Sequence, residues 1–187
     1  ECYRALARGV DYASGIFGGR EFALAFGVNE MPGYHTGPAS HVGYLSGARH
    51  SHLDSAGYSL DQKTLADNSK LDPEKTAREL WEEESWRQIL SSLVICFFAR
   101  KVYSPEMVQQ ALKTVGFEIS IPELHQLGED ILLRKHQFKI REGFDLDQQR
   151  IPERILETPS SSGAVEEDFM REVLTHISSK INRTGKK

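Results

Sequence analysis

The fold class follows from residues 72–98, which read DPEKTARELWEEESWRQILSSLVICFF. Asp72 followed by Pro73 is typical of a helix start, with an N-cap residue and a proline at the first helical position. We therefore predict a helix that runs from here toward Arg100. Its apolar face carries Leu80, Trp81, Ile89, Leu90, Leu93 and Phe97. Between Leu93 and Phe98 apolar residues point to every side, which predicts that this end of the helix is buried all round.

Further helices are predicted toward the C-terminus. Ser104-Pro105 starts a helix that Gly116 ends, because glycine readily adopts the left-handed conformation that closes a helix. Ser120-Ile-Pro-Glu123 is a capping box that starts another helix, which ends near Gly143. A last amphipathic helix has apolar residues at four-residue steps from Val165 to Ile181.

The N-terminal part differs in character, since ten of the 15 glycines lie at or before Gly57. A helix is predicted over Tyr3–Ser14, and the alternation over Phe22–Val28 predicts a short strand. Glycine with interspersed histidine predicts an irregular loop over Glu30–Gly57. The fold class is thus all-α (mainly helical), with a Gly/His-rich loop region and at most a short strand near the N-terminus.

We predict three parts along the chain. Residues 1–57 form the Gly/His-rich N-terminal part, residues 58–158 a helical domain, and residues 159–187 a linker followed by the C-terminal amphipathic helix. The chain starts with Glu1 in a segment that already resembles the middle of a helix, which suggests a piece of a longer protein.

Composition narrows the function classes. The 187 residues carry a net charge of -4 and no basic stripe, which argues against nucleic acid as a partner. No apolar run approaches the ~20 residues that a membrane helix needs, so no membrane partner is predicted. Two cysteines, Cys2 and Cys96, cannot build a disulfide framework, and this favours a reducing, cytoplasmic location.

The sequence RHSHLD places His50 and His52 two residues apart. In extended backbone both side chains would point to one side and could bind a metal such as zinc. His35, His41 or Asp54 could then supply a third ligand. A general acid–base role is an alternative, because histidine titrates near neutral pH. A purely structural pair, with one ring hydrogen-bonded in a loop and the other solvated, is the third interpretation.

Two other features, Cys96 and the acidic run Glu82–Glu84, are weaker candidates for a functional site. Cys96 could be a small hydrophobic residue of the core, because iron–sulfur clusters usually need four thiolates and the chain has two. The acidic run Glu82–Glu84 cannot converge on one site, since consecutive helical residues point in different directions, and a solvated face is predicted for it.

Several ordered motifs resemble one known family. They are Glu21-Phe22-Ala23, Glu30-Met-Pro-Gly-Tyr34, Gly116-Phe117, Leu127-Gly128-Glu129, Phe138–Phe144 and Ile151-Pro-Glu-Arg154. Together they resemble the C-terminal helical region of the tungsten-containing aldehyde:ferredoxin oxidoreductases, over roughly residues 5 to 158. The resemblance implies a part of an enzyme that oxidises aldehydes to carboxylic acids and passes electrons to ferredoxin. It also implies a tungsten (or molybdenum) bis-pterin, a 4Fe-4S cluster, and missing N-terminal domains of the same protein.

The resemblance assigns roles to three residues. The family's loop histidine beside the metal falls on His52, where it would transfer a proton or hydrogen-bond the substrate. The family motif D-x-x-G-L-C falls on residues 91–96, so that Ser91 stands at the pterin-contacting aspartate, Val94 at the glycine and Cys96 at the last cluster cysteine. The other three cluster cysteines would lie upstream.

Two alternatives stay open, and the departures at Ser91 and Val94 favour the first of them. One is a non-catalytic helical scaffold or interaction module that has lost cofactor binding. The other is a small His-ligated metal-binding protein built on His50 and His52. A homo-oligomer is possible in each case.

Overall fold

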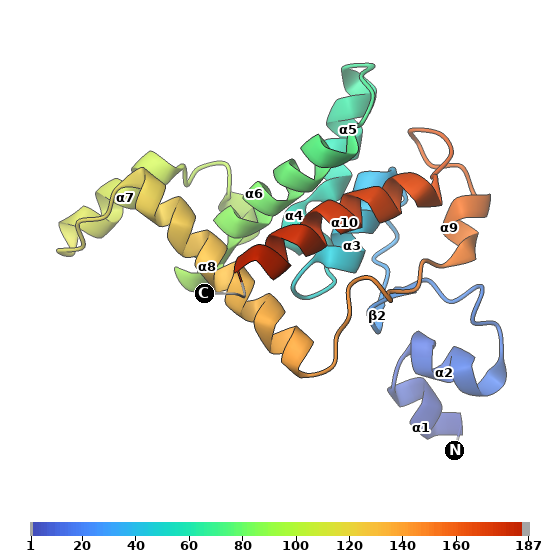
Figure 1. The fold of residues 1–187 in the computed structure, drawn as a ribbon. Helices are drawn as coiled ribbons and strands as arrows, with labels where there is room; N and C mark the ends of the chain where they lie inside the picture. The colour runs from blue at the N-terminus through green and yellow to red at the C-terminus, as the bar shows by residue number, and fades with distance from the viewer. Residues whose placement is uncertain (1, 185–187) are drawn as a thin grey trace.

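The computed structural model describes residues 2–184, and in that range it is mainly helical, as predicted (Figure 1). The α-helices are α1 (Cys2–Ala7), α2 (Val10–Phe17), α3 (Pro38–Ser46), α4 (His52–Ser55), α5 (Gly57–Ala66), α6 (Pro73–Ser92), α7 (Pro105–Thr114), α8 (Ile121–Arg141), α9 (Glu153–Glu157) and α10 (Glu167–Thr184). A 3-10 helix, η1, covers Phe97–Ala99, and the strands β1 (Ala25–Phe26) and β2 (Asn29–Glu30) form a small antiparallel hairpin.

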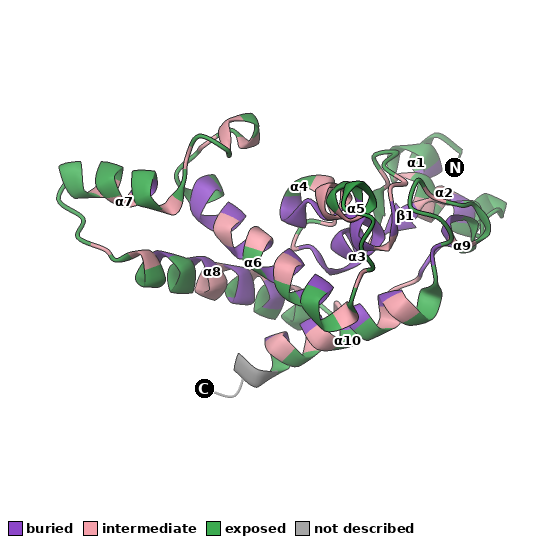
Figure 2. Cartoon of the chain, turned by 90° about the horizontal axis from the view of Figure 1, so that it is seen from above, coloured by how far each residue is buried: buried purple, intermediate pink, exposed green. Residues whose placement is uncertain are grey.

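Helix α6 is the central element of the fold. It packs against α8, α10, α4 and α3. In Figure 1, α7 and the start of α8 form an arm that extends away from this body, while α1 and α2 lie at the opposite corner. Figure 2 shows that the buried residues follow the inner faces of α6, α8, α10 and α3.

The main core lies where these four helices meet. Its buried members include Val42 and Leu45 of α3, Leu80 and Trp81 of α6, Leu132 of α8, and Met170, Val173 and Ile177 of α10. Burying each large apolar side chain contributes about 1.5–3 kcal/mol, so this cluster provides most of the stabilisation. A second, smaller cluster of Ile89, Leu90, Val108 and Leu124 connects the arm to the end of α6.

The predicted helix starts are confirmed. A carboxylate oxygen of Asp72 accepts a hydrogen bond from the backbone N–H of Lys75 at 2.8 Å. Ser120 and Glu123 form the expected capping box, with the Ser120 N–H donating to the Glu123 carboxylate at 2.8 Å. Helix α10 lies where the four-residue apolar spacing placed it, and the predicted N-terminal helix is divided into α1 and α2 at Gly9.

The prediction of an irregular loop over Glu30–Gly57 is wrong, because α3 and α4 occupy much of this range. Pro38 starts α3 as an ordinary N1 proline. The glycines serve packing: a Cβ on Gly57 would lie 2.1 Å from the carbonyl oxygen of Ala39. Glycine therefore lets α5 approach the backbone of α3, and a glycine-rich composition is here a sign of close helix packing.

The predicted burial of residues 93–98 is also wrong. Helix α6 ends at Ser92, and Val94 and Phe98 are 91% and 97% exposed. The backbone turns out of the helix because Val94 adopts the left-handed conformation, with φ at 59°. Leu93, Val94 and Phe98 consequently face outward, whereas Ile95 and Phe97 are partly buried against the second cluster.

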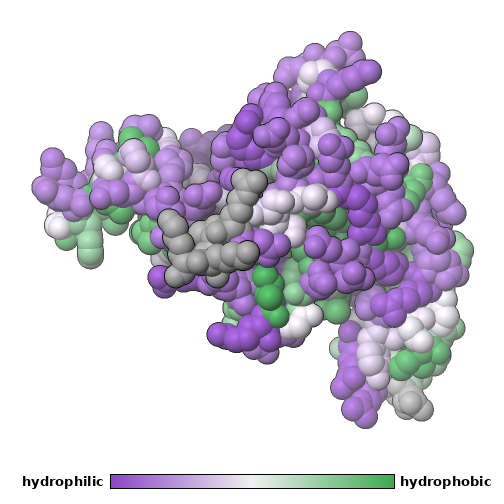
Figure 3. All heavy atoms as spheres, in the orientation of Figure 1, coloured by the Kyte–Doolittle hydropathy of each residue, from purple (hydrophilic) through white to green (hydrophobic). Residues whose placement is uncertain are grey.

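Other apolar side chains are exposed at the two extremities of the molecule. Tyr3 and Leu6 of α1 are largely exposed, as are Val115 and Phe117 at the end of the arm. Figure 3 shows hydrophilic side chains over most of the face that carries α10, with apolar patches toward the N-terminal helices and the far end of the arm.

Candidate functional site

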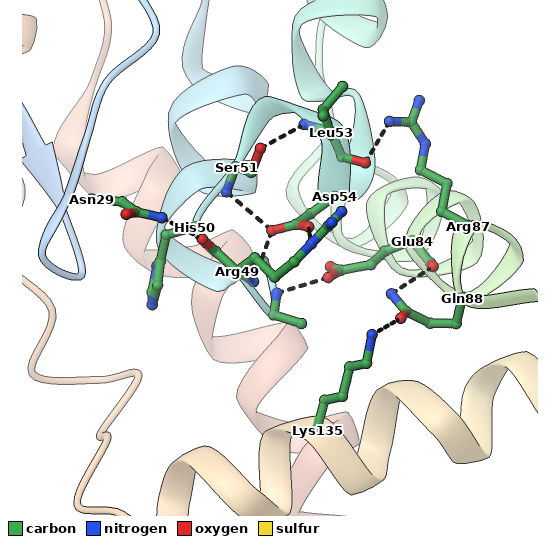
Figure 4. Close-up of polar contacts among 12 residues, drawn as sticks. Asn29, Arg49, His50, Ser51, Leu53, Asp54, Glu84, Arg87, Gln88 and Lys135 are labelled. Carbon is green, nitrogen blue, oxygen red and sulfur yellow. Dashed lines mark hydrogen bonds and ion pairs between the residues drawn. The ribbon is translucent and has the colours of Figure 1, made fainter. Parts of the chain in front are cut away.

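Polar and charged side chains gather where the α3–α4 connection meets α6 and α8 (Figure 4). We call Arg49, His50, Asp54, Glu84 and Lys139 the buried polar cluster, after its two buried carboxyl groups; His50 and Lys139 are partly buried, and Arg49 closes the cluster on the solvent side. Asp54 is fully buried and Glu84 is 3% exposed, although both can carry charge. Such groups are costly to bury unless hydrogen bonds or opposite charges accompany them.

Asp54 organises the start of α4. Its carboxylate accepts hydrogen bonds from the backbone N–H groups of Arg49 and Ser51, at 2.9 and 3.0 Å. It also pairs with the Arg49 side chain, whose Nε lies 2.8 Å from Oδ1. Ser51 completes a capping box with Asp54. The carboxylate therefore fixes the backbone immediately before and after His50.

Glu84 lies on the buried face of α6, beside this turn. Its Oε1 accepts a hydrogen bond from the backbone N–H of Ala48 at 2.8 Å. Burial, followed by the negative charge of Asp54, raises the pKa of Glu84 to about 8. Glu84 is therefore protonated at neutral pH and holds an exchangeable proton inside the protein.

His50 and Lys139 form the side of the cluster that faces α8. The Lys139 ammonium donates to the carbonyl of Gly47 at 3.1 Å and lies 3.0 Å from Nε2 of His50. The other ring nitrogen of His50, Nδ1, donates to the carbonyl of Tyr44 at 2.8 Å. Burial and the neighbouring ammonium lower the pKa of His50 to about 4, and burial lowers the pKa of Lys139 to about 8.

His52 begins α4 and is only partly buried. Its ring packs against Tyr34, with the ring centroids 5.1 Å apart. Burial and then the positive charge of Arg87 lower the pKa of His52. The imidazole is therefore neutral at pH 7 and can accept a proton.

Arg87 connects α4 with the turn that follows α6. Its Nη1 donates to the carbonyl of Leu53 at 2.7 Å, and its guanidinium lies 5.5 Å from the ring centroid of Phe97. Arg49 lies over the same ring, at 5.9 Å. The residue after Cys96 thus packs against arginines that hold the start of α4, and the segments of His52 and Cys96 meet at this end of α6.

The remaining predicted site residues are accessible. Ser91 lies in the last turn of α6 and is exposed, and Cys96 is a free, exposed thiol immediately before η1. The interpretation of Cys96 as a core residue is wrong, since its side chain does not pack in either hydrophobic cluster.

The predicted metal site on His50 and His52 is not formed. Both ring nitrogens of His50 face protein groups, as described above, and its φ of 54° is not extended. The possible third ligands are engaged elsewhere, because His35 and His41 lie 2.8 Å apart and Asp54 holds Arg49. Among residues 2–184, no group of three or more His, Cys, Asp or Glu side chains could hold a metal ion.

Sequence reasoning missed Glu84. The prediction of a solvated acidic run holds for Glu82 alone, since Glu83 is half-buried and Glu84 is buried. The apolar neighbours Leu80 and Trp81, at four and three residues before it, place Glu84 on the inner face of α6 by helical spacing. That spacing was the available signal.

The family model for aldehyde ferredoxin oxidoreductase, domains 2 & 3, matches residues 1–178. The chain belongs to this family. The suspected relationship is thereby confirmed, and the chain is a member of an oxidoreductase family. No curated protein and no solved structure gives a significant match. Within the described residues, no helix combines the length and apolar character that crossing a bilayer requires.

The structure shows why glycine suits the position of Val94 in the family motif that falls on residues 91–96. The N–H of Ile95 donates to the carbonyl of Leu90 at 2.9 Å and the N–H of Val94 to that of Ser91 at 3.1 Å. These two bonds define a Schellman motif, in which glycine is the usual residue at the left-handed position. Helices α7 and α8 end in the same way with Gly116 and Gly143. Val94 occupies that position in α6 of this aldehyde ferredoxin oxidoreductase relative.

Restoring the glycine is expected to stabilise the chain. A β-branched residue in the left-handed region is strained, so Val94→Gly should raise the free energy of unfolding by about 1 kcal/mol. Chemical denaturation measures this change. Val115→Gly is the matched control, because Val115 is an exposed residue at the C-cap of α7 with φ at -106°. We expect that control to be neutral or destabilising, and an equal gain in both variants would contradict the strain at Val94.

Proposed function

We propose that the chain is part of an oxidoreductase that oxidises aldehydes to carboxylic acids and passes electrons to ferredoxin. The family match supports this reaction class. The observation that carries the assignment to particular residues is the contact between the Cys96 turn and α4 through Arg87. That contact brings a free thiol and a neutral imidazole to the same end of α6. We further propose a cytoplasmic location, which the two free cysteines support.

The residues present fit single ligands and not a complete cofactor site. Cys96 is exposed on a turn and can supply one thiolate to a 4Fe-4S cluster, whereas such a cluster usually takes four. Ser91 is exposed in the last turn of α6, where its hydroxyl can donate one hydrogen bond to a pterin. The remaining ligands would have to come from polypeptide outside these residues. When bound, a tungsten or molybdenum bis-pterin would supply the two-electron chemistry.

His52 is proposed to accept the proton that aldehyde oxidation releases. The lowered pKa keeps its imidazole neutral at pH 7, and its partial exposure leaves it accessible to a substrate. The packing of its ring on Tyr34 fixes its orientation. General base catalysis of this kind typically contributes 10²–10⁴-fold to a rate.

In the complete holoenzyme, His52→Gln should lower kcat/KM for aldehyde oxidation by about 100-fold and leave the content of bound metal unchanged. Steady-state kinetics and elemental analysis measure the two quantities. His125→Gln is the control, because His125 is an exposed histidine of α8. Equal kinetics for His52→Gln and the unaltered enzyme would exclude His52 from proton transfer.

A non-catalytic scaffold is the second candidate. It is favoured by the exposed apolar side chains of Val94 and Phe98, which offer a contact surface to another protein segment. Elemental analysis of the complete protein separates the two candidates. Tungsten or molybdenum together with iron supports the oxidoreductase, and a protein free of all three supports the scaffold.

A further inference from the structure

A cavity of about 440 Å³ lies between α5, α6 and the turn after η1. Its size falls within the range of small-molecule sites, which is about 300–1,000 Å³. The lining contains neither Cys96 nor His52, and of the residues discussed for the site proposed above it includes Arg87 alone. Its polar lining includes Ser59, Lys63, Arg87, Arg100 and Lys101.

Arg87 has unused hydrogen-bonding capacity at this cavity. The residue is 2% exposed, its Nε pairs with Glu83 at 2.7 Å, and its Nη1 donates to Leu53. Its Nη2 is buried and has no hydrogen-bond partner among the described residues. A buried N–H group without an acceptor is costly, and guanidinium groups favour oxyanions, which accept two parallel hydrogen bonds.

The charges around the cavity favour an anion. Two carboxylates line it, and each has a cationic partner: Glu79 lies 3.8 Å from Lys75, and Glu83 pairs with Arg87. The cations Lys63, Arg100 and Lys101 line the cavity too, and none of them is within 4.0 Å of a carboxylate in the part of the chain that the structure describes. Several cations without a counter-charge at one opening raise the local concentration of anions.

Part of the lining of the cavity is apolar. Trp86, Leu60, Leu80 and Leu90 contribute to its lining. The indole of Trp86 offers a flat surface against which an aromatic or aliphatic group can pack. The cavity thus combines a cationic part with an apolar part, a combination that suits an amphipathic anion better than a bare ion.

We propose that this cavity binds a small organic anion. Its oxyanion group, a phosphate or a carboxylate, contacts Arg100 and Lys101 and is attracted by the buried charge of Arg87, and its apolar group packs on Trp86. Nothing in this proposal requires the redox cofactors, so it stands or falls independently of the proposed function.

Isothermal titration calorimetry on the complete protein tests the proposal with four probes. Phenyl phosphate and benzoate carry an oxyanion and a ring, inorganic phosphate carries the oxyanion alone, and benzyl alcohol carries the ring alone. We expect one equivalent of phenyl phosphate or benzoate to bind at least about tenfold more tightly than inorganic phosphate, and benzyl alcohol not to bind. The tighter of the first two identifies the anion class. Failure of both to bind, or binding of benzyl alcohol with equal affinity, would overturn the proposal.

Variants at the accessible cations locate the binding site. Arg100→Gln combined with Lys101→Gln should weaken binding by about tenfold or more, because charge-assisted hydrogen bonds are stronger than neutral ones. Lys113→Gln, an exposed lysine of α7 outside this lining, should bind as the unaltered chain does. Far-UV circular dichroism confirms folding of the variants, since neither Arg100 nor Lys101 is buried. Unchanged affinity in the double variant would rule out this cavity.

Discussion

Asp54→Ala is expected to lower the free energy of unfolding by about 2–4 kcal/mol, one of the largest effects of any single polar substitution in this chain. The fully buried carboxylate accepts from two backbone N–H groups, those of Arg49 and Ser51, and pairs with the Arg49 side chain. Alanine leaves both N–H groups without their acceptor and removes the capping box of α4. Urea denaturation at neutral pH measures the loss.

The control for this substitution is Asp67→Ala. Asp67 is an exposed residue at the C-cap of α5, so we expect a change of no more than about 0.5 kcal/mol. Asp54→Asn should fall between the two, because an amide keeps one acceptor oxygen and loses the charge that attracts Arg49. A loss below 1 kcal/mol for Asp54→Ala would show that α4 does not depend on this carboxylate.

Glu84→Gln is expected to change how stability depends on pH. The pKa of Glu84 is about 8 in the folded chain against the ordinary value of 4.5, because burial disfavours its charged form. Between these two pH values the folded state binds more protons than the unfolded state. The contribution of Glu84 to stability is therefore complete below about pH 4.5 and is lost as pH rises through about 8.

The difference in unfolding free energy between the unaltered chain and Glu84→Gln isolates the contribution of Glu84. Relative to Glu84→Gln, the unaltered chain should lose a few kcal/mol of unfolding free energy between pH 5 and pH 9, since each pKa unit corresponds to about 1.4 kcal/mol. The subtraction is needed because His41, His50 and His136 have pKa values lowered to about 3, 4 and 4, which reduces stability below their ordinary value of 6.5. Glu82→Gln, at an exposed position, should track the unaltered chain. Parallel curves for all three proteins would refute a raised pKa at Glu84.

Local signals in the sequence predict most helix ends correctly. Asp72 and the capping box at Ser120 start α6 and α8, and Gly116 and Gly143 end α7 and α8, because each signal acts through hydrogen bonds within a few residues. Where the local signal is unusual, the prediction fails. Val94 ends α6 in a left-handed conformation that is typical of glycine. The sequence therefore predicts a helix that continues toward Arg100, whereas α6 ends at Ser92.

Burial over long distances in the sequence is harder to predict. Gly57 was interpreted as a loop residue because its contact with Ala39 of α3 joins positions that no local pattern relates. The same holds for Glu84, whose partner Ala48 comes from a different element. The candidate site depends on such contacts, so the sequence supplied His52 and Cys96 through family resemblance, while the buried polar cluster around Asp54 became visible only in the structure.

The family resemblance and the structure both point to the start of α4 and the end of α6. The resemblance assigns roles to His52, Ser91 and Cys96, and the structure shows that His52 is partly exposed and that Ser91 and Cys96 are exposed. Arg87 holds the start of α4 and contacts Phe97, which follows Cys96 directly. A ligand role for Cys96 is the part of this account on which the redox assignment depends most.

Iron content of the complete protein tests that role most directly. Cys96→Ser removes the proposed cluster thiolate, and Cys2→Ser is the matched control, because both cysteines are free and exposed. We expect Cys96→Ser to lose most of the bound iron and the absorbance of its cluster, and Cys2→Ser to retain both. Equal iron content in the two variants would contradict the assignment of Cys96 as a cluster ligand.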